Sequence, residues 1–151
     1  MAITKRSEKG SSLTHDELDA NFTHLEKNFT VTNSGSGAYV FDGAGTTSEN
    51  NPTLYLTRGE TYTFYINASG HPFLIKTASG TGTGDQYTDG VSNNGIDSGD
   101  IEFVVQMDAP ETLYYNCQYH SSMAGTIYID KKSTTVAATV DDATALAIAL
   151  G

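Results

Sequence analysis

Four side chains that can bind a transition metal occur in a distinctive order along this chain. Cys117, His120 and Met123 follow one another at intervals of three residues, and His71 comes well before them. Copper that changes oxidation state needs sulfur for the reduced ion and imidazole nitrogen for the oxidised ion. Two His with one Cys and a weak axial Met supply both. The pattern therefore predicts a site for one copper ion, and the expected ligands are His71, Cys117, His120 and Met123.

The same residues leave other interpretations open. A single Cys is most often an inert buried thiol, and a single Met is most often core filler. A metal could also stiffen the surrounding loops without any redox role, because binding only to the folded state stabilises that state. A polar cluster without metal is a further alternative. The chain has one Cys, so it cannot form an internal disulfide, and the redox compartment stays undecided.

The segments that would position these residues read as short β strands. Leu54 and Leu56 alternate with polar residues, and the same alternation continues at Tyr62, Phe64 and Ile66. Further strands are expected at 38–41, 72–76, 101–106, 112–117 and 126–129. Residues 77–99 are rich in Gly, Ser, Thr, Asn and Asp, which is typical of a loop. About seven short strands predict a mainly β fold built as a two-sheet sandwich.

Part of this region resembles the cupredoxin family of small blue-copper domains. The resemblance lies in residues 52–64, in the run His71-Pro72-Phe73 and in the spacing Cys117-x-x-His120-x-x-Met123. It implies a cupredoxin-like Greek-key β-sandwich over residues 37–130. It also implies that His71, Cys117, His120 and Met123 bind copper as a type 1-like site.

The first thirty residues predict a short α-helix. Thr14 is a suitable N-cap, and Glu17 completes a capping box three residues later. An apolar stripe with helical spacing follows, and the helix should run over about 15–27. We expect residues 1–30 to serve as an anchor or oligomerisation segment, 31–36 as a linker and 131–151 as a tail. The expected anchor side chains are Leu13, Leu18, Phe22 and Leu25.

Residues 10–25 are similar to the short helical lead of phage tail-fibre and other virion proteins. The shared pattern is Leu-Thr-x-x-Glu-Leu-Asp-Ala-Asn-Phe, here at positions 13–22. The resemblance implies that this segment contacts other virion proteins of the capsid, neck or tail, and that it can form a homo-oligomer. Residues 1–10 lack the apolar stretch of a secretory signal, which fits a virion protein made in the host cytoplasm.

Two functions therefore follow from the sequence. The leading hypothesis is a bacteriophage virion structural protein, a fibre, spike or decoration, that displays a cupredoxin-like domain with a type 1 copper-like site. The alternative is a soluble copper electron-transfer protein. In either case copper is the one cofactor expected.

Charge and composition exclude several other classes. The formal net charge is −10, and residues 38–130 contain eleven acids but only Arg58 and Lys76 as basic residues. Such a domain should be repelled by nucleic acid and by anionic lipid. No apolar run approaches the ~20 residues needed to cross a bilayer. No nucleophile–base pair or distinctive carboxylate pair suggests an enzyme, although the Tyr-rich and Gly-rich loops leave carbohydrate or receptor binding open.

Overall fold

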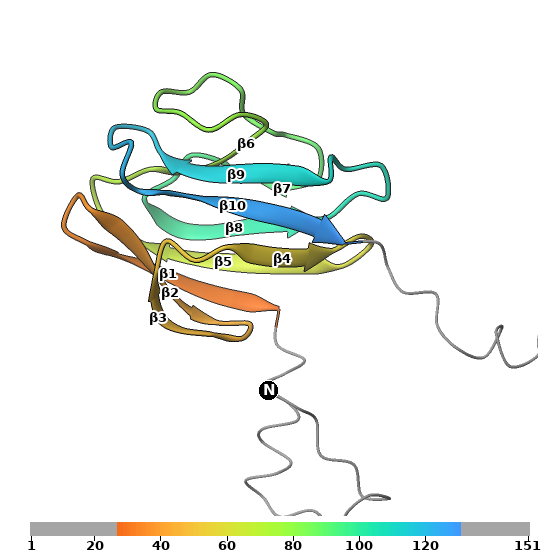
Figure 1. Ribbon diagram of the computed structural model, residues 1–151, viewed down its shortest axis with the longest axis horizontal. Helices are drawn as coiled ribbons and strands as arrows, with labels where there is room; N and C mark the ends of the chain where they lie inside the picture. The colour runs from red at the N-terminus through yellow and green to blue at the C-terminus, as the bar shows by residue number, and fades with distance from the viewer. Residues whose placement is uncertain (1–26, 131–151) are drawn as a thin grey trace, which may run out of the picture.

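The computed structural model describes residues 27–130, which form two β-sheets packed face to face (Figure 1). The first sheet has six strands in the spatial order β3-β2-β1-β5-β8-β7. Their bounds are β1 Asn28–Ser34, β2 Ala38–Gly43, β3 Thr46–Asn50, β5 Thr61–Asn67, β7 Val91–Ser92 and β8 Ser98–Val104. The second sheet has the order β4-β10-β9-β6. Its strands are β4 Leu54–Thr57, β6 Phe73–Lys76, β9 Thr112–Cys117 and β10 Ala124–Asp130.

The predicted mainly β sandwich is confirmed. The seven strands expected from alternation coincide with β2, β4, β5, β6, β8, β9 and β10. The helix expected at 15–27 lies almost entirely outside the described residues, as do the anchor side chains Leu13, Leu18, Phe22 and Leu25 and the tail at 131–151. Residues 27–130 contain no helix, and so none that could span a membrane.

The expected linker at 31–36 is wrong, and so is the expected start of the sandwich at residue 37. Residues 28–34 form β1, which pairs antiparallel with β2 and parallel with β5. Phe29 and Val31 point into the core and are almost completely buried, which explains why this segment must belong to the sheet. The second half of β1 is polar and runs directly into the Gly-rich turn, so the sequence reads as one continuous linker. In the structure only Gly35 to Gly37 form the turn into β2.

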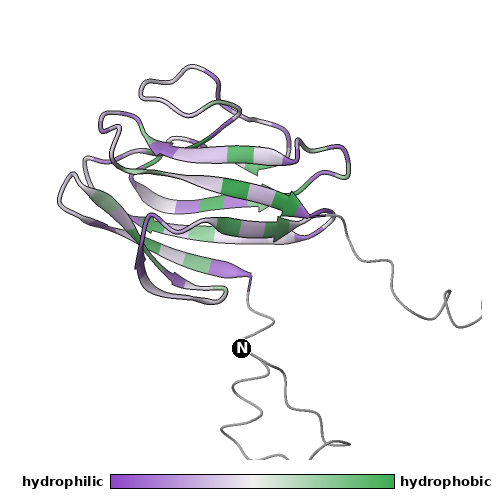
Figure 2. Ribbon diagram, viewed as in Figure 1, coloured by the Kyte–Doolittle hydropathy of each residue, from purple (hydrophilic) through white to green (hydrophobic). Residues whose placement is uncertain are grey.

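One continuous core lies between the two sheets. Along β5 the inward-facing Tyr62, Phe64 and Ile66 are buried, whereas the residues between them are exposed or half-buried. Figure 2 shows the same alternation of hydrophobic and hydrophilic residues along β10 and β4. Aromatic rings from both sheets meet at the centre, where Phe73 stacks on Tyr115 at a centroid distance of 5.4 Å and lies 5.7 Å from Phe64. Burial of each such side chain contributes about 1.5–3 kcal/mol.

The long segment between β6 and β8 lies along the free edge of β6, which is the last strand of its sheet. Asn94 accepts a hydrogen bond from the backbone of Ile75 and donates to the carbonyls of Ile75 and Tyr87. Lys76 is 1 % exposed and its ammonium donates to the carbonyl oxygens of Gly80 and Gly82. The predicted loop at 77–99 is therefore largely loop, but it contains β7 and the start of β8 and is held down by its own polar groups.

Both ends of the described chain lie beside residues 57–63, which comprise the turn between β4 and β5 and the start of β5. The backbone N–H of Arg58 donates to the carbonyl of Asp130, and Thr63 donates to the carbonyl of Lys27. Lys27 also forms an ion pair with Glu60. The seven residues of β5 run from this turn to the opposite end of the sandwich, a length of roughly 20 Å.

Candidate metal centre

His71 lies where the chain crosses from one sheet to the other. It follows β5 of the first sheet and precedes β6 of the second. A tight turn sets its position, because the His71 N–H donates to the carbonyl of Ala68 and Gly70 adopts a φ of +80°. The backbone N–H of Gly70 donates to the Asp97 carboxylate at 2.7 Å, which ties this turn to the segment before β8.

Cys117 and His120 come from the neighbouring strand and the loop that follows it. Cys117 ends β9 and pairs with Phe73 of β6. The pairing continues for one more residue, because the Gln118 N–H donates to the carbonyl of Pro72. Since β6 and β9 are adjacent, the residue before β6 and the loop after β9 are brought to the same end of the sandwich. The pairing of β6 with β9 therefore places both imidazoles beside the thiol.

Three of the four predicted ligands converge. The two imidazole Nδ1 atoms of His71 and His120 lie 3.1 Å apart. Cys117 Sγ lies 3.5 Å from Nδ1 of His120 and 3.9 Å from Nδ1 of His71. A point equidistant from these three atoms lies about 2 Å from each, close to the usual length of a metal–imidazole bond and slightly short of a metal–thiolate bond. The spacing of the three donor atoms therefore fits one small transition-metal ion.

Met123 closes the same loop. Its side chain is completely buried, its N–H donates to the carbonyl of His120, and its carbonyl accepts from the Cys117 N–H. These two bonds make residues 117–123 a compact loop whose ends are joined. The role of the Met123 thioether as a fourth, axial ligand stays a prediction.

The surroundings of the Cys117 sulfur hold it in place. Cys117 is completely buried, and its Sγ accepts a hydrogen bond from the Tyr119 N–H at 3.4 Å. The buried Tyr39 phenol lies near it. Burial raises the pKa of Tyr39 well above its usual range, and the neighbouring Cys117 raises it further. The phenol therefore remains protonated and available as a hydrogen-bond donor throughout the physiological pH range.

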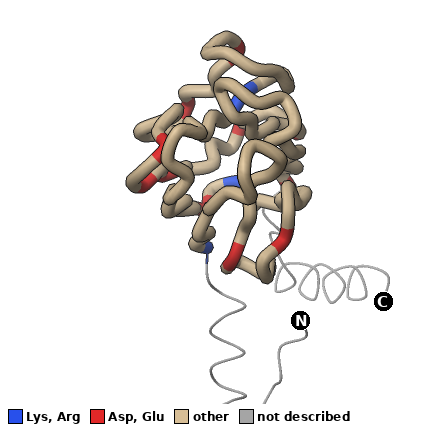
Figure 3. The backbone as a smooth tube through the Cα atoms, turned by 90° about the vertical axis from the view of Figure 1, so that its left-hand side faces the viewer, with Lys and Arg blue, Asp and Glu red and all other residues tan. Residues whose placement is uncertain are grey.

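Of the four predicted ligands, only the two imidazoles lie near the surface. His71 and His120 are half-buried, whereas Cys117 and Met123 are buried. Tyr119 is 61 % exposed, and its ring stands edge-on to the ring of His120 at a centroid distance of 6.5 Å. Figure 3 faces this end of the molecule and shows many acidic and few basic positions. Arg58 and Lys76 are buried and Lys27 pairs with Glu60, so the described surface is dominated by negative charge.

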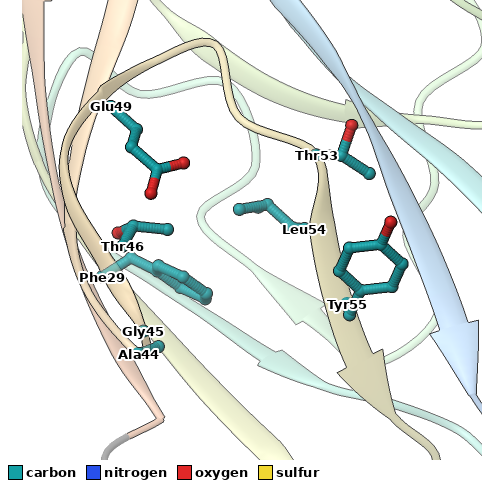
Figure 4. A pocket seen from close by; sticks show the side chains of 8 residues that line it. All are labelled: Phe29, Ala44, Gly45, Thr46, Glu49, Thr53, Leu54 and Tyr55. Atoms are coloured by element: carbon teal, nitrogen blue, oxygen red, sulfur yellow. The ribbon is translucent and has the colours of Figure 1, made fainter. Parts of the chain in front are cut away.

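A separate cleft lies away from the ligand set (Figure 4). It has a volume of about 180 Å³ and opens between the β2–β3 hairpin and β4. In Figure 4 the Glu49 carboxylate and the Tyr55 ring lie on opposite sides of it. It contains none of the four predicted ligands. Its lining residues are Phe29, Ala44, Gly45, Thr46, Glu49, Thr53, Leu54 and Tyr55.

Two residues next to the ligands could not be picked out from the sequence. Tyr39 reads as one more alternating strand residue, and Asn51 reads as a turn residue after β3. Their partners are remote in the chain: the Tyr39 hydroxyl donates to the carbonyl of His71, and the Asn51 amide donates to that of Ser122. No local signal in the sequence marks such contacts.

No protein-family model matches the chain, and no curated protein matches it. Among solved structures, the fold is similar to that of a rusticyanin variant, with a TM-score of 0.46 and 19 % identity over 68 % of this chain and 76 % of that chain. Rusticyanin from Thiobacillus ferrooxidans gives a TM-score of 0.42 and 21 % identity, with the same coverage of each chain. A purple cupredoxin from Nitrosopumilus maritimus gives a TM-score of 0.43 and 17 % identity over 70 % of this chain and all of that one. Likeness at this level does not establish membership of a family.

Proposed function

We propose that residues 27–130 bind one copper ion and carry single electrons between redox partners. The observation that carries this proposal is the convergence of one thiol sulfur and two imidazole nitrogens from two segments of the fold. Two His and one Cys, with a Met available as an axial ligand, form the donor set typical of blue-copper electron-transfer sites. The two-sheet sandwich is also the fold that the cupredoxin resemblance implies.

Each residue has a distinct part in this proposal. When bound, copper would supply a one-electron couple whose oxidised and reduced ions both accept this mixed sulfur and nitrogen set. Cys117 provides the thiolate in a buried setting, and the buried Met123 keeps water from that side. His71 and His120 hold the ion near the surface, where their half-buried rings offer a short route for an electron. No residue is assigned a catalytic role.

An absorption spectrum of the purified full chain tests the proposal directly. Adding one equivalent of copper(II) should produce an intense visible band from charge transfer between the thiolate and copper. Cys117→Ser should show no such band while keeping the circular dichroism of a folded β protein. An unchanged visible spectrum in the wild-type chain would refute copper binding through Cys117. Zinc(II) should bind at the same place without colour, because its d shell is filled, and should slow the uptake of copper.

A second role, in a virion, rests on residues 1–30. Support comes from the resemblance of residues 10–25 to phage tail-fibre segments, with Leu13, Leu18, Phe22 and Leu25 as anchor side chains. The described domain adds one compatible feature. Both of its ends adjoin the β4–β5 turn, so a segment attached at either end would leave the ligand end pointing away from the attachment.

The isolated segment 1–29 is the material that tests the virion role. Sedimentation of a labelled peptide with assembled phage particles, or self-association measured by analytical ultracentrifugation, would support an anchor. A Leu18→Asp and Phe22→Asp double variant serves as the control, because it destroys the apolar stripe and should abolish either activity. A wild-type peptide that stays monomeric and binds no particle would remove the basis for this role.

A further inference from the structure

A buried tyrosine links the first sheet to the segment that carries His71. Tyr39 belongs to β2 and is completely buried. Its hydroxyl donates to the backbone carbonyl of His71 at 2.7 Å, while its ring packs edge-on against Phe73, two residues further along, at 5.1 Å. The protonated phenol therefore holds the backbone of one predicted ligand, although it is not itself a ligand.

Asn51 fixes the backbone of this tyrosine from both sides. Its N–H donates to the carbonyl of Tyr39 at 2.8 Å, and its side-chain Oδ1 accepts from the N–H of Tyr39 at 2.9 Å. Asn51 has a φ of +46°, in the left-handed region that Asn tolerates better than most residues. The conformation lets one residue satisfy both backbone groups of its partner.

The other end of the Asn51 side chain reaches the second ligand segment. Its Nδ2 donates to the carbonyl of Ser122 at 2.9 Å, between His120 and Met123. The hydroxyl of Ser122 in turn donates to the carbonyl of Ser36 in the β1–β2 turn. The first sheet therefore contacts the far side of the ligand loop, across from the β6–β9 pairing.

We propose that Tyr39 and Asn51 form a positioning bridge that sets the separation of His71 from the Cys117–Met123 loop before any metal binds. The pairing of β6 with β9 fixes only one side of the site, and it ends where Gln118 bonds to Pro72. Residues 119–122 lie beyond that last hydrogen bond. The bridge supplies a second attachment on the opposite side, and two attachments fix an orientation that one leaves free.

This inference rests on the proposed copper site, but the bridge can also be tested without metal. Asn51→Asp keeps the Oδ1 acceptor for Tyr39 and the tolerance for positive φ, and it removes the donor to Ser122. The matched control is Asn93→Asp. Asn93 also has a positive φ, of 59°, and its amide donates to the carbonyl of Asp100, which has no part in the bridge. Both variants add the same single negative charge.

In the copper-loaded full chain, the rate of copper loss to an excess of chelator is the first measurement. Loss of a partner that hydrogen-bonds directly to a metal ligand typically lowers metal affinity by about 10- to 100-fold, and Asn51 acts one step further out, through Ser122 in the loop between His120 and Met123. Because water can reach the exposed Ser122, the expected acceleration for Asn51→Asp lies near tenfold, against no change for Asn93→Asp. A carboxylate placed near a cation would by charge alone strengthen binding, so weaker binding identifies the lost contact as the cause.

In the metal-free full chain, amide hydrogen exchange at Met123 and Tyr119 is the second measurement. Their N–H groups donate within the ligand loop. Both amides should exchange at least several-fold faster in Asn51→Asp than in Asn93→Asp. Tyr39→Phe removes the donor to His71 and should have the same effect. Its control is Tyr115→Phe, which removes a buried hydroxyl bonded to Pro52 instead.

The outcomes separate the two hypotheses. A wild-type chain that takes up no copper refutes the proposed function. The hydrogen-exchange comparison in the metal-free chain then tests the positioning bridge by itself. If copper binds but Asn51→Asp matches Asn93→Asp within about twofold in both copper loss and exchange, the bridge is refuted and the copper site stands. Faster loss and faster exchange in both Asn51→Asp and Tyr39→Phe, with both controls unchanged, support the bridge.

Discussion

Cys117 and Met123 are buried completely, whereas the rings of His71 and His120 reach toward the surface. This division separates two needs of a redox site. The sulfur is shielded from oxidants and from thiol exchange, which depend on access to a thiolate. The half-buried imidazole edges lie close to solvent, as the proposed electron transfer requires. The exposed Tyr119 lies beside His120 on the same side of the site.

Replacing Met123 with Leu tests its part in the site. The two side chains have similar volumes, so the cost in stability should stay below about 1.5 kcal/mol. The thioether is only a weak extra donor, and the oxidised ion, which takes more ligands than the reduced ion, loses more when it is removed. The reduction potential of the copper-loaded protein should therefore rise. We expect a rise of at least about 60 mV, a tenfold change in a one-electron equilibrium. Voltammetry of both proteins measures it, and an unchanged potential would remove Met123 from the ligand set.

Two buried tyrosines should make the metal-free protein sensitive to alkali. Burial raises the pKa of Tyr39 and of Tyr115 above the usual value, which is about 10. Above pH 10 the unfolded chain releases these protons and the folded chain keeps them, so the free energy of unfolding falls as pH rises. Each tyrosine should contribute a slope of about 1.4 kcal/mol per pH unit.

Urea unfolding at several pH values between about 9 and 11 checks this slope. Tyr115→Phe lowers stability at every pH because it leaves the Pro52 carbonyl without the buried hydroxyl, but it should also make the decline above pH 10 shallower. A variant that declines as steeply as the wild-type chain would show that Tyr115 ionises equally in both states.

Residue types and spacing were enough to predict that Cys117 and His120 lie together. Cys117 and His120 are three residues apart, and a loop of that length keeps both near one point once Met123 returns to the Cys117 backbone. The contribution of His71 depends on the pairing of β6 with β9, which the family resemblance implies but local pattern does not. Tyr39 and Asn51 were missed because hydrogen bonds to remote backbone carbonyls leave no trace in local sequence.

At the scale of elements, β1 is the strand that positions the rest of the first sheet. It lies between β2 and β5 and pairs with both. Alternation predicted the strands whose outward residues are plainly polar and whose inward residues are large, as in β5. It failed for β1, where Ser and Gly follow directly, for the entirely polar β3, and for the two-residue β7. Short or polar strands are defined by their neighbours rather than by their own residues.

Two glycines of the β2–β3 hairpin provide a matched test of how closely β1 packs. Gly43 and Gly45 have φ values of +93° and +92°. A Cβ at Gly43 would lie 2.3 Å from the carbonyl oxygen of Asn28, whereas one at Gly45 would meet nothing within 4 Å. Gly45→Ala should therefore cost about 1–2 kcal/mol from the left-handed backbone alone. Gly43→Ala should cost about 1–3 kcal/mol more because of the clash.

Chemical denaturation of the two variants measures that difference. Since the two φ angles match, subtracting one cost from the other leaves the contact with β1. Equal destabilisation would mean that β1 can move away from the hairpin without loss, contrary to the paired sheet described above.

At the scale of the whole molecule, the sandwich starts earlier than its polar residues suggest. The fragment 27–130 contains every described strand and should unfold in one cooperative transition. The fragment 37–130 lacks β1, and with it the buried Phe29 and Val31. Loss of a large buried side chain typically costs about 2–5 kcal/mol, and here two are lost together with the pairing to both neighbours. The total approaches the 5–15 kcal/mol that stabilises a typical domain.

Circular dichroism during thermal unfolding compares the two fragments. The longer one should melt sharply, and the shorter one should show no cooperative transition. A sharp transition in 37–130 would mean that β2 can pair directly with β5, so that β1 is dispensable.

The meeting of both described chain ends at the β4–β5 turn has a consequence for how such a domain can be combined with others. A domain whose entry and exit points are neighbours can be inserted at a single cut in a surface loop of another protein, because the host chain is interrupted at only one place. Lys27 and Asp130 both contact residues within 57–63. Residues 27–130 are therefore suited to insertion into a loop of a host protein. His71 and His120 would then lie at the end of the inserted domain furthest from the host, one strand length from the host surface.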